Sequence, residues 1–366
     1  MPPDPARCRA RDLGIAPGIF RPGRHNAITD VADVRVGQVT RIQGASVRTG
    51  VTAILPHGGN PFRERVPAGL AVLNGFGKLA GATQLEELGE LETPIVLTNT
   101  LAVGRAMEAV VDWTLALPGN EAVRSVNAVV GETNDGKLND IRSRGVAQAD
   151  VLKALSEATD GPVAEGTVGA GTGTVAFGWK GGIGTSSRML PPALGGFSLG
   201  VLVQTNFGGT LIADGVNLGR ALDHFYLREH ADRGDADGSV MLIVATDAPL
   251  SDRNLRRLAV RAGVGLARTG AAFSDGSGDY AIAFSTHPGV RRQSDAQEPR
   301  PLLDLPNAQM SPLFVAAADA TEEAILNSLF MATTVTATGV DGQALRADAI
   351  DLDAVRAVLA RTGRAT

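Results

Sequence analysis

A charged segment near the middle of the chain runs directly into a stretch that is expected to fold as a buried strand. Residues 228–238 are poor in apolar side chains, whereas 239–245 are apolar after the first residue. A buried strand must pair within a sheet, because its backbone N–H and C=O groups otherwise lose their hydrogen bonds. We therefore expect the residues on both sides of this junction to share one domain, 1–366, rather than to form two independent domains.

Short β-type runs and helical patterns alternate along the chain, with no internal repeat and no Pro-rich or Ser-rich linker. This mixture predicts an α+β protein whose strands are buried on at least one face. The helix at 252–267 has well-marked ends, with Ser251 as the expected N-cap and Gly270 beyond the last turn. The expected strands are 51–55, 95–98, 128–130, 201–204, 240–244 and 280–284, and the expected helices are 105–117, 150–158, 252–267, 321–331 and 352–361.

Composition argues against several classes of function. The net charge of -5, from 34 Lys and Arg against 39 Asp and Glu, offers no basic surface for nucleic acid. The five His show no ligand spacing, so no metal site is expected. The sequence shows no secretory signal and no run of about 18 apolar residues, which favours a cytoplasmic protein without a membrane partner. Cys8 is the single cysteine and is expected to be a surface thiol rather than a nucleophile.

Two glycine-containing motifs suggest other chemistry but lack the context it requires. The stretch 169–174 lacks the third glycine and the following helix of a dinucleotide-binding turn, so tight turns are expected there. Ser198 lies in a G-x-S-x-G sequence, the pattern of an α/β-hydrolase nucleophile, but a strand follows where that motif needs a helix. An unprocessed esterase that uses Ser198, with Asp247 and His287 as candidate partners, is an alternative function.

The junction between Gly238 and Ser239 carries the strongest chemical hypothesis. Asp237-Gly238-Ser239 taken alone is most often a turn. A tight peptide that enters a buried strand is also a place where the Ser239 hydroxyl can attack the preceding carbonyl and form an ester that water opens. The freed α-amine has a reference pKa of about 7.7–8.0 and can act as the base for its own hydroxyl. This hypothesis makes the chain an N-terminal-nucleophile amidohydrolase.

Four further polar residues lie at the ends of expected strands. Ser277 and Asp279 are two residues apart before the strand 280–284, so they share a face and can hold the Ser239 hydroxyl and amine, unless they only form a hairpin turn. Asn206 ends a strand and can donate its amide to an oxyanion. Glu132 also ends a strand and can bind a substrate ammonium. A turn residue is the ordinary alternative for both.

Several segments in order resemble one known family, the self-processing P1-type aminopeptidases. This family includes the L-aminopeptidase/D-amidase/esterase and the β-peptidyl aminopeptidases. The resemblance covers nearly the whole chain. Several matching segments in the same order are more specific than any single motif. The segments are NAITDV at 26–31, ETNDG at 132–136, LND at 138–140, VQTNFG at 203–208, GS at 238–239, ATDAPL at 245–250, LARTG at 266–270, GSGD at 276–279 and AILNS at 324–328.

The resemblance implies cleavage between Gly238 and Ser239 into an α chain, 1–238, and a β chain, 239–366, that remain together. It implies a four-layer αββα sandwich, similar to the N-terminal-nucleophile hydrolases but with different connectivity, and a homotetramer of αβ units. Ser239 is then the nucleophile, Ser277 and Asp279 support it, Asn206 helps to form the oxyanion hole and Glu132 receives the substrate amine.

The implied activity is release of small N-terminal residues, either β-amino acids such as β-alanine or L- or D-alanine, from small peptides, amides or esters. It proceeds through an acyl-enzyme and needs no metal or other cofactor. Two residues depart from parts of the family: Asn134 stands where some members have Tyr, and Asp279 stands where β-peptide-cleaving members can have Glu. Besides the Ser198 esterase, the alternatives are a self-cleaving acyltransferase of the ornithine-acetyltransferase type and a catalytically silent binding protein.

Overall fold

Two β-sheets form the centre of the protein, and the computed structural model describes residues 7–225 and 238–363. The larger sheet has the order β15-β3-β14-β13-β10-β9, with β4 on β3, and the smaller has the order β1-β2-β5-β6. The larger sheet consists of β3 (Glu64–Gly75), β4 (Glu90–Leu91), β9 (Ile183–Met189), β10 (Ser198–Asn206), β13 (Ser239–Thr246), β14 (Gly278–Ser285) and β15 (Arg292–Gln293). The smaller sheet consists of β1 (Arg35–Gln43), β2 (Val47–Leu55), β5 (Ile95–Asn99) and β6 (Val129–Thr133).

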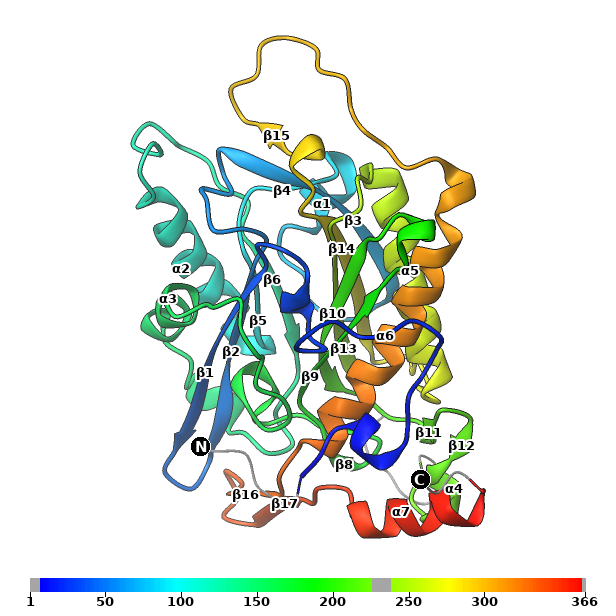
Figure 1. Ribbon diagram of the computed structural model, residues 1–366. Coiled ribbons are helices and arrows are strands. Elements are labelled where there is room, and N and C mark those ends of the chain that lie inside the picture. The colour runs from blue at the N-terminus through cyan, green and yellow to red at the C-terminus, as the bar shows by residue number, and fades with distance from the viewer. Residues whose placement is uncertain (1–6, 226–237, 364–366) are drawn as a thin grey trace.

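Helices cover the outer face of each sheet. Helices α5 (Asp252–Arg268) and α6 (Ser311–Phe330) pack on the larger sheet, and α2 (Val103–Leu115) and α3 (Gln148–Ser156) lie on the opposite side of the molecule, against the smaller sheet (Figure 1). Three buried apolar clusters separate the four layers, one between each neighbouring pair. The αββα sandwich implied by the resemblance is therefore confirmed.

Short elements complete the described chain. No described helix is long and apolar enough to cross a membrane. The short helices are α1 (Ala82–Glu87), α4 (Leu218–Ala221) and α7 (Leu352–Arg361), and the short ribbons pair β7 (Val175–Ala176) with β8 (Trp179–Lys180), β11 (Ile212–Ala213) with β12 (Val216–Asn217), and β16 (Val335–Thr338) with β17 (Ala344–Ala347).

The six predicted strands correspond to β2, β5, β6, β10, β13 and β14, and the ends predicted for α5 are confirmed. Ser251 accepts the Asn254 backbone N–H, and Gly270 has a φ of 83°. Strands β1, β3 and β9 were not predicted. Helix α6 begins ten residues before its predicted start because it is buried on nearly all sides, including at Asp319 and Glu323, and so shows no amphipathic pattern.

Strand β13 lies between two strands, one from the sequence before the Gly238–Ser239 junction and one from the sequence after it. It pairs antiparallel with β10, which precedes Gly238, and parallel with β14, which follows it. Strands from both sides of the junction thus share one sheet, as the apolar character of 239–245 indicates. Residues 228–237 of the charged segment lie outside the described residues.

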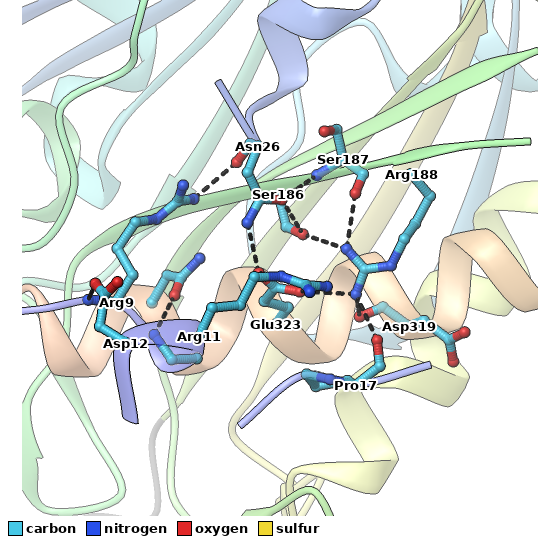
Figure 2. Close-up of polar contacts among 12 residues, drawn as sticks. Arg9, Arg11, Asp12, Pro17, Asn26, Ser186, Ser187, Arg188, Asp319 and Glu323 are labelled. Carbon is cyan, nitrogen blue, oxygen red and sulfur yellow. Dashed lines mark hydrogen bonds and ion pairs between the residues drawn. The ribbon is translucent and has the colours of Figure 1, made fainter. Parts of the chain in front are cut away.

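A buried cluster of charges also joins the two parts of the chain (Figure 2). Glu323 on α6 accepts hydrogen bonds of 2.8 Å from Arg11 Nε, Arg11 Nη2 and Arg188 Nη2, and one of 2.5 Å from Asn26 Nδ2. The side chains of Arg188 and Glu323 are both fully buried. Because a buried charge without a partner is costly, these contacts fix α6 against β9 and the N-terminal segment.

Candidate active site

The bond between Gly238 and Ser239 lies at the start of β13, in the middle of the larger sheet. Ser239 is 6% exposed, and its Oγ donates to the Gly238 carbonyl oxygen at 2.7 Å. The Gly278 backbone N–H donates to the same oxygen at 3.1 Å. The hydroxyl thus lies beside the carbonyl that precedes it, and two donors polarise that carbonyl.

Gly238 is required here by the close approach of a neighbouring segment. A Cβ at this position would lie 2.9 Å from Phe207 Cα and 3.0 Å from Phe207 Cβ. Backbone atoms cannot move away as the end of a flexible side chain can. A side chain at 238 would therefore displace the carbonyl that Ser239 faces.

Asn206 lies directly across the sheet from Ser239. The two residues are opposite each other in the antiparallel pair of β10 and β13, so their side chains leave the sheet on the same face. The Val175 N–H donates to Asn206 Oδ1 at 3.0 Å, which fixes the orientation of the amide. The Asn206 amide nitrogen makes no hydrogen bond to another described residue and is available as a donor beside Ser239.

Ser277 and Asp279 form a pair at the start of β14. Ser277 Oγ donates to Asp279 Oδ1 at 2.5 Å, as expected for two residues on one face. Burial raises the pKa of the Asp279 carboxyl, while the Ser277 hydroxyl and the Val240 backbone N–H act against that rise. Neither residue makes a hydrogen bond to the Ser239 hydroxyl within the described structure, so the contact with β13 is made at Val240, one residue further along.

Glu132 is a buried carboxylate at the end of β6, with an exposed fraction of 2%. The Lys78 backbone N–H donates to its Oε1 at 2.9 Å, and the Thr100 hydroxyl donates to its Oε2. Both donors are neutral, and no cationic side chain among the described residues lies within ion-pair distance. Such a carboxylate can bind a cation supplied by a ligand.

Two residues that the sequence reasoning missed connect Glu132 with β14. The Tyr280 hydroxyl donates to the Gly77 carbonyl at 2.8 Å. A Cβ on Gly77 would lie 2.8 Å from Tyr280 Cε2 and 3.3 Å from Glu132 Oε1. Burial raises the pKa of Tyr280, and the negative charges of Glu132 and Asp279 raise it further. The sequence signal for Tyr280 was its position directly after Asp279, whereas nothing in the sequence signals its contact with Gly77.

Ser198 is not a hydrolase nucleophile of the elbow type. It is the first residue of β10, so a strand and not a helix follows it. Its backbone N–H and hydroxyl donate to Asp247 Oδ1 at 2.7 Å and Oδ2 at 2.8 Å. His287 Nδ1 instead accepts the Gly289 N–H at 3.0 Å. The structure therefore contradicts the esterase alternative, because no histidine in the described chain activates Ser198.

The glycine-rich stretch 169–174 forms a 3-10 turn at Gly169–Gly171, as the sequence predicted. The buried Lys180 Nζ donates to the Gly171 carbonyl at 2.8 Å and to the Gly181 carbonyl at 2.6 Å. Burial lowers the pKa of Lys180 to about 7. These contacts hold the turn next to β7, whose Val175 orients Asn206.

Comparison with known proteins agrees with this geometry. The sequence model of the family described as "Peptidase family S58" matches residues 26–344 of this chain. The beta-peptidyl aminopeptidase BapA of Sphingosinicella microcystinivorans is 42% identical over 358 residues, which cover 92% of this chain and 89% of that protein. A solved beta-aminopeptidase from a Burkholderia species superposes with a TM-score of 0.87 at 40% identity, covering 97% of this chain and 99% of its own.

A second solved structure links the fold with the chemistry. The L-aminopeptidase D-Ala-esterase/amidase from Ochrobactrum anthropi, described as a variant of the Ntn hydrolase fold, has a TM-score of 0.87 at 37% identity. The alignment covers 98% of this chain and 99% of that one. The resemblance drawn from the motifs is confirmed. The chain belongs to peptidase family S58 and is an aminopeptidase.

Proposed function

We propose that this protein cleaves its own bond between Gly238 and Ser239 and then acts through the new N-terminal Ser239. In this proposal it releases small N-terminal residues from peptides, amides or esters through an acyl-enzyme. The substrates are β-amino acid derivatives such as β-alanyl amides, together with L- or D-alanyl derivatives. The names of the relatives from Sphingosinicella, Burkholderia and Ochrobactrum support these substrate classes.

The observation that carries the proposal is the geometry of the 238–239 bond. Ser239 Oγ lies 2.7 Å from the Gly238 oxygen, and Gly278 N–H is a second donor to it. Attack of Oγ on the Gly238 carbonyl carbon forms an ester, breaks the C–N bond and moves the hydroxyl proton to the nitrogen. Water then hydrolyses the ester, which leaves a carboxylate on Gly238 and a free amine and hydroxyl on Ser239.

The second part of the reaction uses the same groups on a substrate. The Ser239 amine takes the hydroxyl proton, Oγ attacks the substrate carbonyl, and the proton passes to the leaving amine. The Asn206 amide donates to the developing oxyanion, a contribution typically worth about 10²–10³ in rate. Glu132 binds the substrate ammonium, which explains a buried carboxylate held only by neutral donors.

Matched serine variants test this proposal. On denaturing gels and by intact mass, we expect the wild type to give fragments 1–238 and 239–366. Ser239→Ala should give one uncut and inactive chain. The control Ser198→Ala, on the neighbouring strand, should give two fragments and an active enzyme. A wild type that stays uncut, or a Ser239→Ala variant that still cleaves, overturns the proposal.

An acyltransferase of the ornithine-acetyltransferase type would share the self-cleavage, so turnover must separate the two. We expect the acyl group of a β-alanyl or alanyl amide to pass to water. Acyl exchange onto an added amine that outruns hydrolysis would favour the acyltransferase. A comparison of kcat/KM for β-alanyl, L-alanyl and D-alanyl amides then identifies the preferred substrate.

A further inference from the structure

The segment that follows β3 crosses from the larger sheet to the smaller one beside Glu132. At its start, the Phe76 N–H donates to the Ser277 carbonyl at 3.2 Å. At its end, Ala80 forms a two-way backbone pair with Val130 on β6. Residues 76–80, which we call the crossing segment, are thus fixed at both ends, one on each sheet.

One peptide unit in the middle of the crossing segment is bound from both sides. Its carbonyl belongs to Gly77 and accepts the Tyr280 hydroxyl at 2.8 Å. Its N–H belongs to Lys78 and donates to Glu132 Oε1 at 2.9 Å. The peptide group is planar, so its C=O and N–H directions are coupled, and hydrogen bonds in series polarise one another. The Tyr280 hydroxyl therefore restrains and polarises the same peptide group whose N–H donates to Glu132.

The packing around Gly77 leaves no space for a side chain at this position. A Cβ on Gly77 would meet Tyr280 Cε2 at 2.8 Å and Gly278 Cα at 3.0 Å. Gly278 in turn lies opposite Ser239 in the sheet. The peptide can reach Glu132 only because glycines let the Tyr280 ring and the two backbones approach closely.

We propose that Tyr280 is a positioning residue for substrate recognition. Through the 77–78 peptide it fixes the Glu132 carboxylate in the orientation that receives the primary ammonium group of a substrate. This inference rests on the proposed function, in which Glu132 binds that ammonium. Tyr280 itself does not touch the reacting atoms, so its loss should weaken recognition of the amine and leave self-cleavage and acyl transfer intact.

The test compares two variants of the same strand. Tyr280→Phe keeps the ring and removes the hydroxyl bond to the Gly77 carbonyl. Ser285→Ala, at the far end of β14, removes a hydroxyl bond of 2.6 Å to the Ala248 carbonyl and serves as the matched control. The effect on substrate recognition should be no larger than the worth of one neutral hydrogen bond, roughly 2–10-fold. Self-cleavage, kcat and KM are measured with a β-alanyl anilide and with its N-acetyl form.

We expect Tyr280→Phe to raise KM for the free-amine substrate about 2–10-fold and to lower its preference over the N-acetyl form by the same factor. Its kcat and self-cleavage should match those of Ser285→Ala. KM and the preference ratio do not depend on the amount of folded enzyme, so a moderate loss of stability does not obscure the result. If Tyr280→Phe keeps the wild-type KM and the wild-type preference for the free amine, the inference about Tyr280 is overturned and the proposed function is not. A wild type without preference for the free amine overturns the proposed function, and the inference with it.

Discussion

Two buried glutamates on this chain have opposite surroundings. Glu323 on α6 is held by two arginines and an asparagine, and its charge is balanced inside the protein (Figure 2). Glu132 on β6 is equally buried but is held by a backbone N–H and a hydroxyl, both neutral. Glu323 therefore joins parts of the fold, whereas Glu132 has no cationic partner among the described residues, as its role in the proposed function requires.

The physical basis of this difference is the cost of removing an ion from water. Burial of an unpaired carboxylate costs several kcal/mol, and an attraction to a partner offsets the cost only with good geometry. Glu323 has this partner within 2.8 Å in Arg188. Glu132 therefore keeps an unmet interaction that a substrate ammonium can satisfy. The same change, Glu→Gln, can be made at both sites and tests the comparison directly.

The largest expected effect is on stability at the Glu323 site. Glu323→Gln removes the ion-pair partner of the fully buried Arg188, so we expect the free energy of unfolding to fall by about 3–5 kcal/mol. Urea unfolding in the uncut Ser239→Ala background keeps the reaction within one chain. Glu157→Gln, at an exposed pair with Lys153, is the control and should change stability by less than about 1 kcal/mol. Equal stability losses at 323 and 157 would contradict this assignment.

The next effect is on activity at the Glu132 site. If Glu132 binds the substrate ammonium as proposed, Glu132→Gln removes one partner of a desolvated charge pair, a loss of about 2–5 kcal/mol. We expect kcat/KM for free-amine substrates to fall by at least about 30-fold, while the free energy of unfolding stays within about 1 kcal/mol of the wild type. Steady-state kinetics of both Glu→Gln variants provides the check, since Glu323→Gln should keep its kcat/KM when folded. A Glu132→Gln enzyme with wild-type kinetics would contradict the proposal that Glu132 binds the substrate ammonium.

These two sites also show which features could be predicted from the sequence and which could not. The apolar run after Ser239 and the strand that ends at Asn206 have local patterns, so both strands were predictable, whereas their pairing became visible only in the structure. Nothing in the local sequence signals the burial of Arg188 and Glu323, because only the tertiary fold brings them together in the interior. The sequence therefore predicted strands β10, β13 and β14 of the larger sheet but not β3 and β9. The roles of the named site residues stay predictions.

Contacts between segments distant in sequence explain the rest. The crossing segment reaches Tyr280 across about 200 residues of sequence, and no local motif signals that contact. Glu132 was found through its motif, but its lack of a cationic partner became visible only in three dimensions.

A smaller effect should follow from crowding Glu132 without changing its charge. In Gly77→Ala, the new Cβ would lie 3.0 Å from Gly278 Cα and 3.3 Å from Glu132 Oε1, so the backbone must shift. Overpacking of this kind costs about 1–3 kcal/mol. We expect a raised KM for free-amine substrates together with lower stability, measured by kinetics and by urea unfolding. Gly104→Ala, on α2 with open space around it, is the control and should leave KM unchanged and stability unchanged or raised by up to about 1 kcal/mol. If Gly77→Ala behaves like Gly104→Ala, the close packing beside Glu132 is not required.

The smallest effect concerns a third glutamate, Glu165, whose side chain is 5% exposed and whose charge balance is intermediate between the other two. Glu165 pairs with one arginine, Arg9, at 2.8 Å, and burial raises the pKa of its carboxyl to about 7. An unfolded glutamate loses its proton near pH 4.5, so between pH 4.5 and 7 the folded state holds a proton that the unfolded state lacks. Stability should therefore fall as the pH rises through this window.

The limit for one such proton is about 1.4 kcal/mol per pH unit. Urea unfolding of Glu165→Gln at pH 5, 6 and 7, in the uncut background, should show a flatter decline than the parent protein. The other buried carboxyl with a pKa raised to about 7, Asp135, keeps part of the decline in both proteins. Parallel pH profiles would mean that one arginine already balances Glu165 fully. One arginine would then neutralise a buried glutamate as well as two do. Glu132 would differ from Glu165 and Glu323 only because no arginine contacts it among the described residues.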